Sequence, residues 1–435
     1  MEPGRSGKER IAVMSLHTTL QGDRIQIALF GKRNAGKSSV INAVTGQQLA
    51  IVSEVKGTTT DPVSKAMELL PLGPCMFIDT PGIDDEGELG EKRVERAMQV
   101  LNRTDIALVV IDINTVEEED LESVRGLPPK EMEIISLIEE KKIPYVIVLN
   151  QADRMEDTAS EEIRNQIAMK NGTVPAVVVS SKTGDGLEEL KDTLIRLAPD
   201  ADAKLHIVGD LIEEGDIILL VVPVDSAAPK GRLIMPQQQV IRDILDNQAI
   251  AIVVQVPQLP KALEDFQDRI KMVITDSQVF KEVSAILPES MLLTSFSILF
   301  ARHKGNLLKL VEGVRTVDRL KDGDRVLIAE GCTHRRQCDD IGTVKIPRWL
   351  KTYTGKDLVI ETCSGMEFPA DLSKYSLIIH CGGCTLHEKE MKHRIFRAGQ
   401  QQVPIVNYGI FIAYVNGILE RSVEVFPDIR YYNPI

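Results

Sequence analysis

Short continuous apolar runs divide the first half of the chain, and polar or glycine-rich segments follow them. The runs cover residues 24–30, 75–78, 144–149 and 174–179. Residues 38–44, shortly after the first run, have the pattern of a helix start. Continuous runs of this kind are typical of parallel strands that are covered on both faces. The pattern predicts an α/β fold in which functional side chains lie where strands end.

The second half continues the alternation of strands and helices. Residues 216–224 and 249–254 are apolar runs, and residues 237–246 between them carry apolar side chains at helical spacing. This β–α–β unit has few partners for its sheet, and a second copy of the chain would supply them. We therefore expect a dimerisation module at residues 205–265. The alternative is a connector that packs on its neighbours.

A glycine-rich loop with the pattern G-x-x-x-x-G-K-S joins the first predicted strand to the first predicted helix. It runs from Gly31 to Ser38. Its glycines let backbone N–H groups curl around a polyphosphate, and the helix N-terminus adds positive potential. Lys37 would bridge the outer phosphates. The predicted nucleotide contacts from this loop are Gly31, Arg33, Asn34, Ala35, Gly36, Lys37, Ser38 and Ser39.

Acidic and amide residues follow the next strands. Asp79 follows the run at 75–78, and a carboxylate at this point can hold Mg²⁺ through water. Ser38 and Gly82 are the other predicted members of this magnesium and switch site. Asn150, Gln151 and Asp153 follow the run at 144–149. An Asp at this point accepts two parallel N–H bonds from guanine, which adenine cannot supply, so such a site discriminates strongly.

A third loop, Ser180, Ser181 and Lys182, follows the run at 174–179 and resembles the last guanine-contacting loop of GTPases. With the phosphate loop and the two strand ends it completes four elements in a fixed order. Their order resembles that of translation-factor-class GTPases, which implies GTP rather than ATP as the nucleotide.

Residues 57–61 resemble the first switch of the TrmE–Era-like GTPases, which potassium activates. Thr59 is the predicted Mg²⁺ ligand there, and Thr58 is the alternative because the threonine triplet leaves the register open. Asn34 occupies the loop position that coordinates K⁺ in this group, although it could also be a simple turn residue. Ile83 stands where Ras-like proteins carry the glutamine that orients water. The resemblance implies a potassium-activated GTPase with Lys37 and Asn34 as catalytic residues.

Composition narrows the class of protein. The 435 residues are 43% hydrophobic, 26% charged and 4% aromatic, with a net charge of −13. Nucleic-acid binding needs a basic surface, so this acidic chain is not expected to bind RNA. No apolar run is long enough to cross a membrane and no signal-peptide core is present, so we expect a cytoplasmic protein. In that reducing compartment, six cysteines are better interpreted as metal ligands or core residues than as disulfides.

Five of the six cysteines lie between residues 332 and 384. A Cys-x-His motif at 332–334 and a His-Cys-x-x-Cys motif at 380–384 each follow a predicted strand. Three thiolates can hold Zn²⁺ together with a fourth protein ligand. They can also hold a 4Fe–4S cluster with one iron open to an exchangeable ligand. The residues alone leave both readings open. Thr385 and Glu388 predict a helix that starts directly after the second motif.

A TrmE–Era-like GTPase followed by these two motifs resembles the FeFe-hydrogenase maturation GTPases, the HydF family, over essentially the whole chain. The resemblance implies Cys332, Cys381 and Cys384 as cluster ligands, with His334 and His380 as candidate additional ligands. It also implies a homodimeric scaffold that uses GTP/GDP, Mg²⁺ and K⁺. This scaffold would receive a transient di-iron subcluster made by radical-SAM maturases and deliver it to the apo FeFe-hydrogenase. The rival hypotheses are a zinc-stabilised regulatory GTPase without a cluster, and an RNA-assembly GTPase.

The length of the chain excludes a single hydrophobic core. The expected organisation is α/β throughout: a phosphate-loop GTPase domain at residues 1–200, a small α/β dimerisation domain at 201–265, and an α/β iron–sulfur cluster domain at 266–435.

Overall fold

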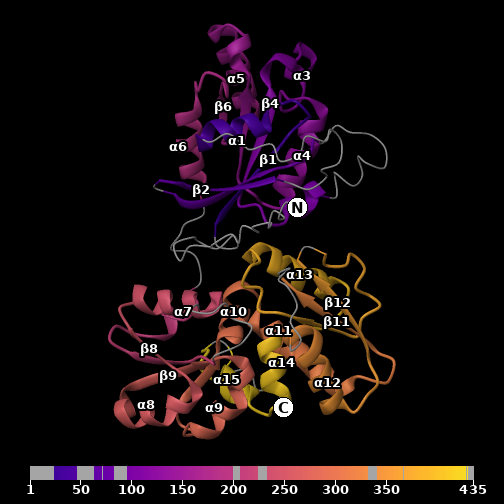
Figure 1. The fold of residues 1–435 in the computed structure, drawn as a ribbon. Coiled ribbons are helices and arrows are strands. Elements are labelled where there is room, and N and C mark those ends of the chain that lie inside the picture. Colours follow the sequence, from indigo (N-terminus) through magenta and orange to yellow (C-terminus); the bar gives the residue numbers. More distant parts are fainter. Residues whose placement is uncertain are drawn as a thin grey trace, which may run out of the picture. The chain divides into compact units, whose positions relative to one another are not determined.

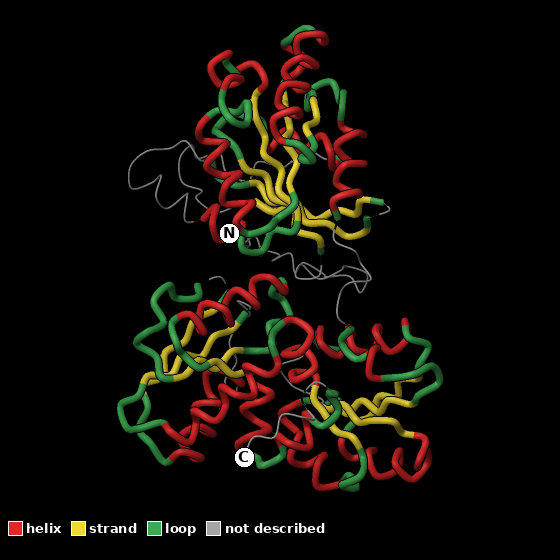
Figure 2. The backbone as a smooth tube through the Cα atoms, turned by 180° about the vertical axis from the view of Figure 1, so that it is seen from behind, coloured by secondary structure: helices red, strands yellow, loops and turns green. Residues whose placement is uncertain are grey.

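The computed structural model describes residues 24–46, 63–70, 72–82, 96–198, 206–223, 233–331, 340–365, 367–427 and 429. The chain divides into two compact units. Residues 1–198 form the first unit, except for 101–103, which group with residues 199–435 in the second. Figure 2 shows the strands of each unit in the interior, with helices around them.

The first unit is built on a six-stranded sheet with the strand order β2-β3-β1-β4-β5-β6. All neighbouring strands are parallel except β2 and β3, which are antiparallel. The strands are β1 (Ile25–Phe30), β2 (Val63–Leu69), β3 (Gly73–Asp79), β4 (Ile106–Asp112), β5 (Tyr145–Asn150) and β6 (Ala176–Val178). The helices are α1 (Lys37–Thr45), α3 (Glu118–Glu122), α4 (Pro129–Glu140), α5 (Asp157–Asn171) and α6 (Leu187–Leu197) (Figure 1).

The predicted apolar runs become the central strands of this sheet. β5 is buried along its whole length, and β4 is buried at every residue except Asp112. Such strands are covered on both faces, which is why their sequences are continuously apolar rather than alternating. Because β1, β3, β4 and β5 run parallel, their carboxyl ends meet along one edge of the sheet, and the polar residues after them meet there too.

The second unit contains two four-stranded parallel sheets, with the orders β10-β9-β7-β8 and β12-β11-β13-β14. The strands of the first are β7 (Ile217–Val221), β8 (Ile250–Val254), β9 (Ile270–Thr275) and β10 (Leu292–Ser295). Those of the second are β11 (Arg325–Glu330), β12 (Val359–Ser364), β13 (Leu377–His380) and β14 (Ile405–Asn407).

One hydrophobic core extends over both of these sheets, from Ile207 to Ile429. Three of the helices, α10, α11 and α14, lie between the two sheets (Figure 1). In α14, every side chain from Tyr408 to Ala413 is buried, as expected for a helix that is apolar on all sides. The helices are α7 (Met235–Asp246), α8 (Leu259–Phe266), α9 (Phe280–Ile286), α10 (Phe296–Lys304), α11 (Leu307–Val314), α12 (Ile346–Thr354), α13 (Glu388–Gln400), α14 (Tyr408–Val415) and α15 (Leu419–Val423).

The predicted boundary at residue 265 is corrected by this arrangement. β7 pairs with β8 on one side and with β9 on the other, so the sheet continues past residue 265 through β9 to β10. In the β–α–β unit at 205–265, β7 thus finds its second partner, β9, within the same chain. β8 remains an edge strand. Among the described helices, none has the length and apolar character needed to cross a membrane.

Candidate functional site

The phosphate loop leaves the carboxyl end of β1 and folds in the way its glycines require. Gly31 has φ +150, and a Cβ there would lie 2.2 Å from the carbonyl oxygen of Val110. Gly36 has φ +88, and a Cβ there would lie 2.2 Å from Nδ2 of Asn150. Both positions therefore exclude any side chain. The absence of a side chain at Gly36 lets the phosphate loop approach Asn150 at the end of β5.

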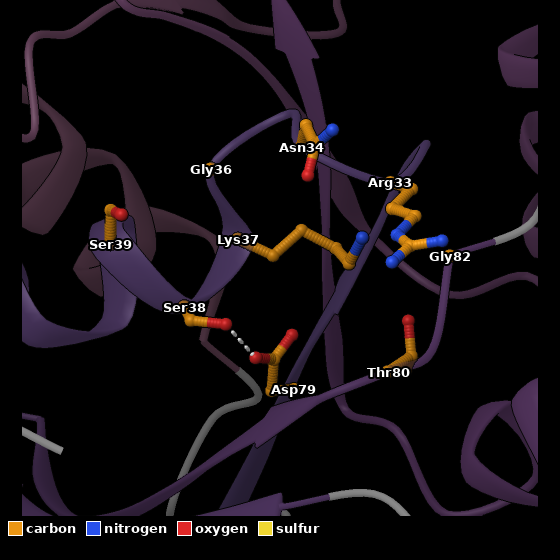
Figure 3. Close-up of a pocket in the computed structure, with 9 residues that line it drawn as sticks. All are labelled: Arg33, Asn34, Gly36, Lys37, Ser38, Ser39, Asp79, Thr80 and Gly82. Atoms are coloured by element: carbon orange, nitrogen blue, oxygen red, sulfur yellow. Dashed lines mark hydrogen bonds between the residues drawn. The ribbon is translucent and has the colours of Figure 1, made fainter. Parts of the chain in front are cut away.

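The loop encloses a pocket of about 450 Å³, within the size range of ligand sites. Lys37 is buried, and its ammonium points back into the loop, where it donates to the carbonyl oxygens of Gly31 (3.0 Å) and Lys32 (2.8 Å). Asn34 lines the pocket in a left-handed conformation, with φ 67. Figure 3 shows the lining residues, which are Arg33, Asn34, Gly36, Lys37, Ser38, Ser39, Asp79, Thr80 and Gly82.

Asp79 lies at the end of β3, opposite the first turn of α1. Its Oδ2 accepts a short hydrogen bond from the hydroxyl of Ser38 (Figure 3). Its Oδ1 is buried and has no hydrogen-bond partner among the described residues. Burial raises the pKa of Asp79, although the Ser38 hydroxyl and the Lys37 ammonium act in the opposite direction. A buried carboxylate oxygen without a partner, beside a hydroxyl, is a donor set that suits Mg²⁺.

The two predicted base-contacting loops meet the phosphate loop. Asn150 is fully buried: its Nδ2 donates to the carbonyl oxygen of Ala35 (3.0 Å), and its Oδ1 accepts from the backbone N–H of Ser181 (3.2 Å). Asp153 accepts from the hydroxyl of Ser180 (3.0 Å) and pairs with the ammonium of Lys182 (3.5 Å). The Ser180 hydrogen bond lowers the pKa of Asp153, so this carboxylate is ionised and ready to accept.

Two residues that the sequence did not single out, Asp112 and Asn114, join this network together with the predicted Gln151. Gln151 adopts a left-handed conformation (φ 65), and its Nε2 donates to Oδ2 of Asp112 (2.8 Å) and to the carbonyl oxygen of Asn34 (3.1 Å). Asn114 donates to Oδ1 of Asp112 (2.9 Å) and to the carbonyl oxygen of Gln151 (3.1 Å). Asp112 ends the apolar strand β4, so the strand-end argument used for Asp79 would have found it.

The predicted switch ligands Thr58 and Thr59 lie outside the described residues, as do Cys332 and His334 of the first cysteine motif. The structure therefore describes two of the three predicted cluster cysteines. In the described part of the chain, no group of three His, Cys, Asp or Glu side chains could together hold a metal ion.

Cys381 and Cys384 lie on the glycine-containing loop after β13, and neither forms a disulfide. The sulfur of Cys381 accepts from the backbone N–H of Gly331 (3.0 Å) and of Gly383 (3.4 Å). The buried Lys304 stabilises the loop by donating to the carbonyl oxygens of Cys384 and Leu386, each at 3.1 Å. Amide donors to a sulfur are typical of iron–sulfur sites, so this loop fits a metal–thiolate centre.

The helix after this loop starts later than predicted. α13 begins at Glu388, and its N-cap is His387, whose side chain accepts from the N–H of Lys389. The hydroxyl of Thr385 instead donates to the carbonyl oxygen of Gly331 (3.1 Å), which ties the loop to the end of β11. Cys384 therefore does not lie at the helix mouth.

His380 is completely buried, and both of its ring nitrogens have partners. Nδ1 lies 2.8 Å from the carbonyl oxygen of Cys381, and Nε2 lies 3.1 Å from Nη1 of Arg394. A carbonyl only accepts and a guanidinium only donates, so the proton is on Nδ1. Burial, followed by the charge of Arg394, lowers the pKa of His380 to about 3, and the hydrogen bond to the carbonyl of Cys381 acts in the opposite direction. In this conformation His380 supports the loop rather than offering a free nitrogen to a metal.

Comparisons with known proteins agree with the fold and the site. Residues 26–151 match the model of the 50S ribosome-binding GTPase family. Residues 207–305 match the hydrogen maturase F dimerization domain, and residues 308–425 match the hydrogen maturase F tetramerization domain. The matches place a phosphate-loop GTPase domain before two domains of self-association.

Two curated relatives that are GTPases each match less than half of this chain. GTPase Der of Kosmotoga olearia is 30% identical over 191 residues, covering 42% of this chain and 41% of the relative. The tRNA modification GTPase MnmE of Legionella pneumophila (strain Corby) is 33% identical over 189 residues, covering 43% of this chain and 37% of the relative. The chain thus spans about two fifths of the length of these relatives. A crystal structure of an Aquifex aeolicus Era variant aligns with a TM-score of 0.35 and 20% identity, over 56% of this chain and 98% of that one.

The fold and the nucleotide pocket define the class of protein as a phosphate-loop GTPase with an α/β second half. The two matches that cover the second half, together with the GTPase match, identify the family. The chain belongs to the hydrogen maturase F family, whose members are hydrogenase maturation GTPases. The match at 308–425 is to a tetramerization domain, in the region where the sequence predicted a cluster domain.

Proposed function

We propose that this chain is a cytoplasmic, potassium-activated GTPase scaffold that holds a 4Fe–4S cluster and a transient di-iron subcluster. In this proposal it receives the di-iron subcluster from radical-SAM maturases and delivers it to the apo FeFe-hydrogenase. Family membership supports the role in hydrogenase maturation. The contact between Gly331 and the sulfur of Cys381 supports the proposed cluster site.

That contact matters because Gly331 immediately precedes Cys332 in the chain. Its N–H lies 3.0 Å from the sulfur of Cys381, so the peptide that leads into the first motif meets the second motif directly. The residue before the first motif thus meets the second motif at the carboxyl ends of β11 and β13, which are neighbours in the sheet. We propose that Cys332, Cys381 and Cys384 together hold the cluster, which supplies an open iron for attachment.

For hydrolysis, we propose that Lys37 binds the outer phosphates and that Ser38 and Asp79 hold Mg²⁺. Mg²⁺ supplies charge stabilisation to the phosphates when it is bound. Asp153 would select guanine, and Asn34 would hold K⁺ against the developing charge. Gln151 fixes the backbone of Asn34 through its 3.1 Å hydrogen bond, which keeps that side chain at the pocket wall.

Self-association has a candidate surface at β8. Among the described strands, β8 is an edge strand of its sheet, and Ile250 and Val253 are each 44% exposed on it. An edge strand offers unpaired backbone groups to another strand, and exposed apolar side chains favour covering it. We propose that β8 pairs with its equivalent in a second copy.

The cluster proposal is tested by iron and sulfide analysis of protein that is purified and reconstituted anaerobically. Cys381→Ser and Cys384→Ser should lose the brown colour and the bound iron. Cys363→Ser is the matched control: burial raises the pKa of the Cys363 thiol to about 11, which disfavours the thiolate form that binds metal. Stoichiometric zinc in a colourless wild-type protein would support the rival zinc-stabilised switch instead.

Delivery is tested by mixing the matured protein with apo-hydrogenase and measuring hydrogen production. The cysteine variants should fail to activate the hydrogenase while they still hydrolyse GTP. Potassium activation is tested with Asn34→Gly, which keeps the left-handed backbone and removes the side chain. This variant should lose the difference in rate between K⁺ and Na⁺. Equal rates in the two salts for the wild type would refute the role of potassium.

A further inference from the structure

Asn407 carries a buried polar group that the described part of the chain does not use. It is fully buried at the carboxyl end of β14. Its Oδ1 caps α14 by accepting from the backbone N–H of Gly409 (2.7 Å) and Ile410 (3.4 Å), and it also accepts from the hydroxyl of Ser297 (3.0 Å). Its Nδ2 has no hydrogen-bond partner among the described residues.

The orientation of this amide is fixed by chemistry. Two backbone N–H groups can only donate, so the atom facing them must be the oxygen. Flipping the amide would place its NH₂ group against both donors and would remove the cap of α14. The two N–H donors of Nδ2 therefore face away from the helix. Buried polar groups are almost always paired, so an unpaired one in a native fold calls for an acceptor.

Asn407 lies beside the cysteine loop. β13 is flanked by β11 on one side and β14 on the other, and Asn407 is the register partner of His380. Cys381 follows His380, so it lies between the end of β11 and the end of β14. Ser297, which binds Oδ1 of Asn407, lies 3.6 Å from the position that a Cβ on Gly382 would take. Ser297 thus links Oδ1 of Asn407 to the cysteine loop near Gly382.

We propose that Nδ2 of Asn407 donates a hydrogen bond to a sulfur of the metal centre on this loop. This inference rests on the proposed cluster. The N–H groups of Gly331 and Gly383 already donate to the sulfur of Cys381, and the side chain of Asn407 would add a donor from the neighbouring strand β14. Donors to cluster sulfurs stabilise the more negative, reduced state and so raise the reduction potential. Asn407 is a positioning and tuning residue here rather than a ligand.

The test separates the amide from the helix cap. Asn407→Ser and Asn407→Asp both keep an oxygen that can cap α14 and both remove the NH₂ group. In the reconstituted holoprotein, Asn407→Ser should shift the midpoint potential of the cluster to a more negative value. Asn407→Asp should also lower the iron content, because a carboxylate would then face an anionic sulfur. Electron paramagnetic resonance during a redox titration measures the first effect, and iron analysis measures the second.

Asn306 provides the matched control. It caps α11 in the same way, by accepting from the N–H of Lys309 (3.1 Å), but it is exposed. Asn306→Ser and Asn306→Asp should leave both readouts at the wild-type level. A potential and an iron content that are unchanged in both Asn407 variants would overturn the inference and reduce Asn407 to a helix cap. A wild-type protein that binds no iron would instead overturn the cluster proposal, and this inference with it.

Discussion

The buried ion pair between Arg394 and Glu390 in α13 should be less destabilised by loss of both side chains than by loss of Glu390 alone. Arg394 is 1% exposed, and Glu390, one helical turn earlier in α13, is 6% exposed. Nε of Arg394 lies 2.7 Å from Oε1 of Glu390. The guanidinium also donates to Nε2 of His380 (3.1 Å) and to the carbonyl oxygen of Gly365 (2.7 Å). The perturbation is Glu390→Met, alone and combined with Arg394→Met.

The single substitution leaves a buried guanidinium without its carboxylate, which typically costs about 3–5 kcal/mol in the free energy of unfolding. Arg103, whose charge also interacts with Glu390, loses this interaction in both variants, so it does not change their order. The double variant removes the Arg394 charge as well and keeps an apolar side chain of similar length at each position. It still loses the two hydrogen bonds to His380 and Gly365, at about 1 kcal/mol each. The double variant should therefore be less destabilised, at about 2–3 kcal/mol, than the single one.

The assay is denaturant unfolding followed by tryptophan fluorescence. Trp349, in α12, is the one tryptophan of the chain and packs against the core of the second unit, so the signal reports on that unit. Glu388→Met is the control, because Glu388 forms an exposed pair with Lys392 on the same helix, and such pairs contribute less than about 1 kcal/mol. A double variant that is less stable than Glu390→Met would refute the reasoning.

Three further outcomes are expected. Asp153→Asn should shift nucleotide preference from GTP toward xanthosine triphosphate, measured by competitive binding; retained guanine selectivity would contradict the assignment of that loop. Burial raises the pKa of Glu131 above 4.5, so wild-type stability should fall as the pH rises from 4.5 through the raised pKa, by at most about 1.4 kcal/mol per unit. Glu131→Gln should remove this pH dependence from the unfolding transition of the first unit, which calorimetry identifies as the transition that GDP shifts. A stability difference between the two proteins that does not change with pH would exclude this role of Glu131. Val253→Lys on the β8 edge should lower the oligomeric mass measured by light scattering. Val359 is an exposed valine on the edge strand β12, and Val359→Lys should leave that mass unchanged. The reverse result would assign the interface to the sheet that contains β12.

The sequence predicted the α/β class and most of the nucleotide pocket because both depend on local patterns. Apolar runs marked β1, β3, β5 and β6, and parallel strands bring the residues that follow them to one edge. Lys37, Asp79, Asn150 and Asp153 therefore lie where strand ends predict. The role of Asp112 was missed because the motifs drew attention to other strands, although the same rule applies to it.

The second half was harder to predict because its contacts are distant in sequence. Nothing local shows that β7 pairs with β9 as well as with β8, so the boundary at residue 265 was placed too early. The environment of His380 depends on Arg394, which comes fourteen residues later on another element. A motif gives the spacing of potential ligands, but burial and partners decide which of them have a free nitrogen or sulfur.

The position of α14 between two sheets has a consequence for synthesis. β7 to β10 are complete by Ser295, long before Tyr408 leaves the ribosome. Chains grow at about 5–20 residues per second, so the apolar faces of α10 and α11 stay uncovered for roughly 5–20 s. During that interval the nascent chain would be a substrate for chaperones and prone to aggregation. A ribosome stalled before residue 408 should therefore carry a protease-sensitive second unit behind a folded, nucleotide-binding first unit.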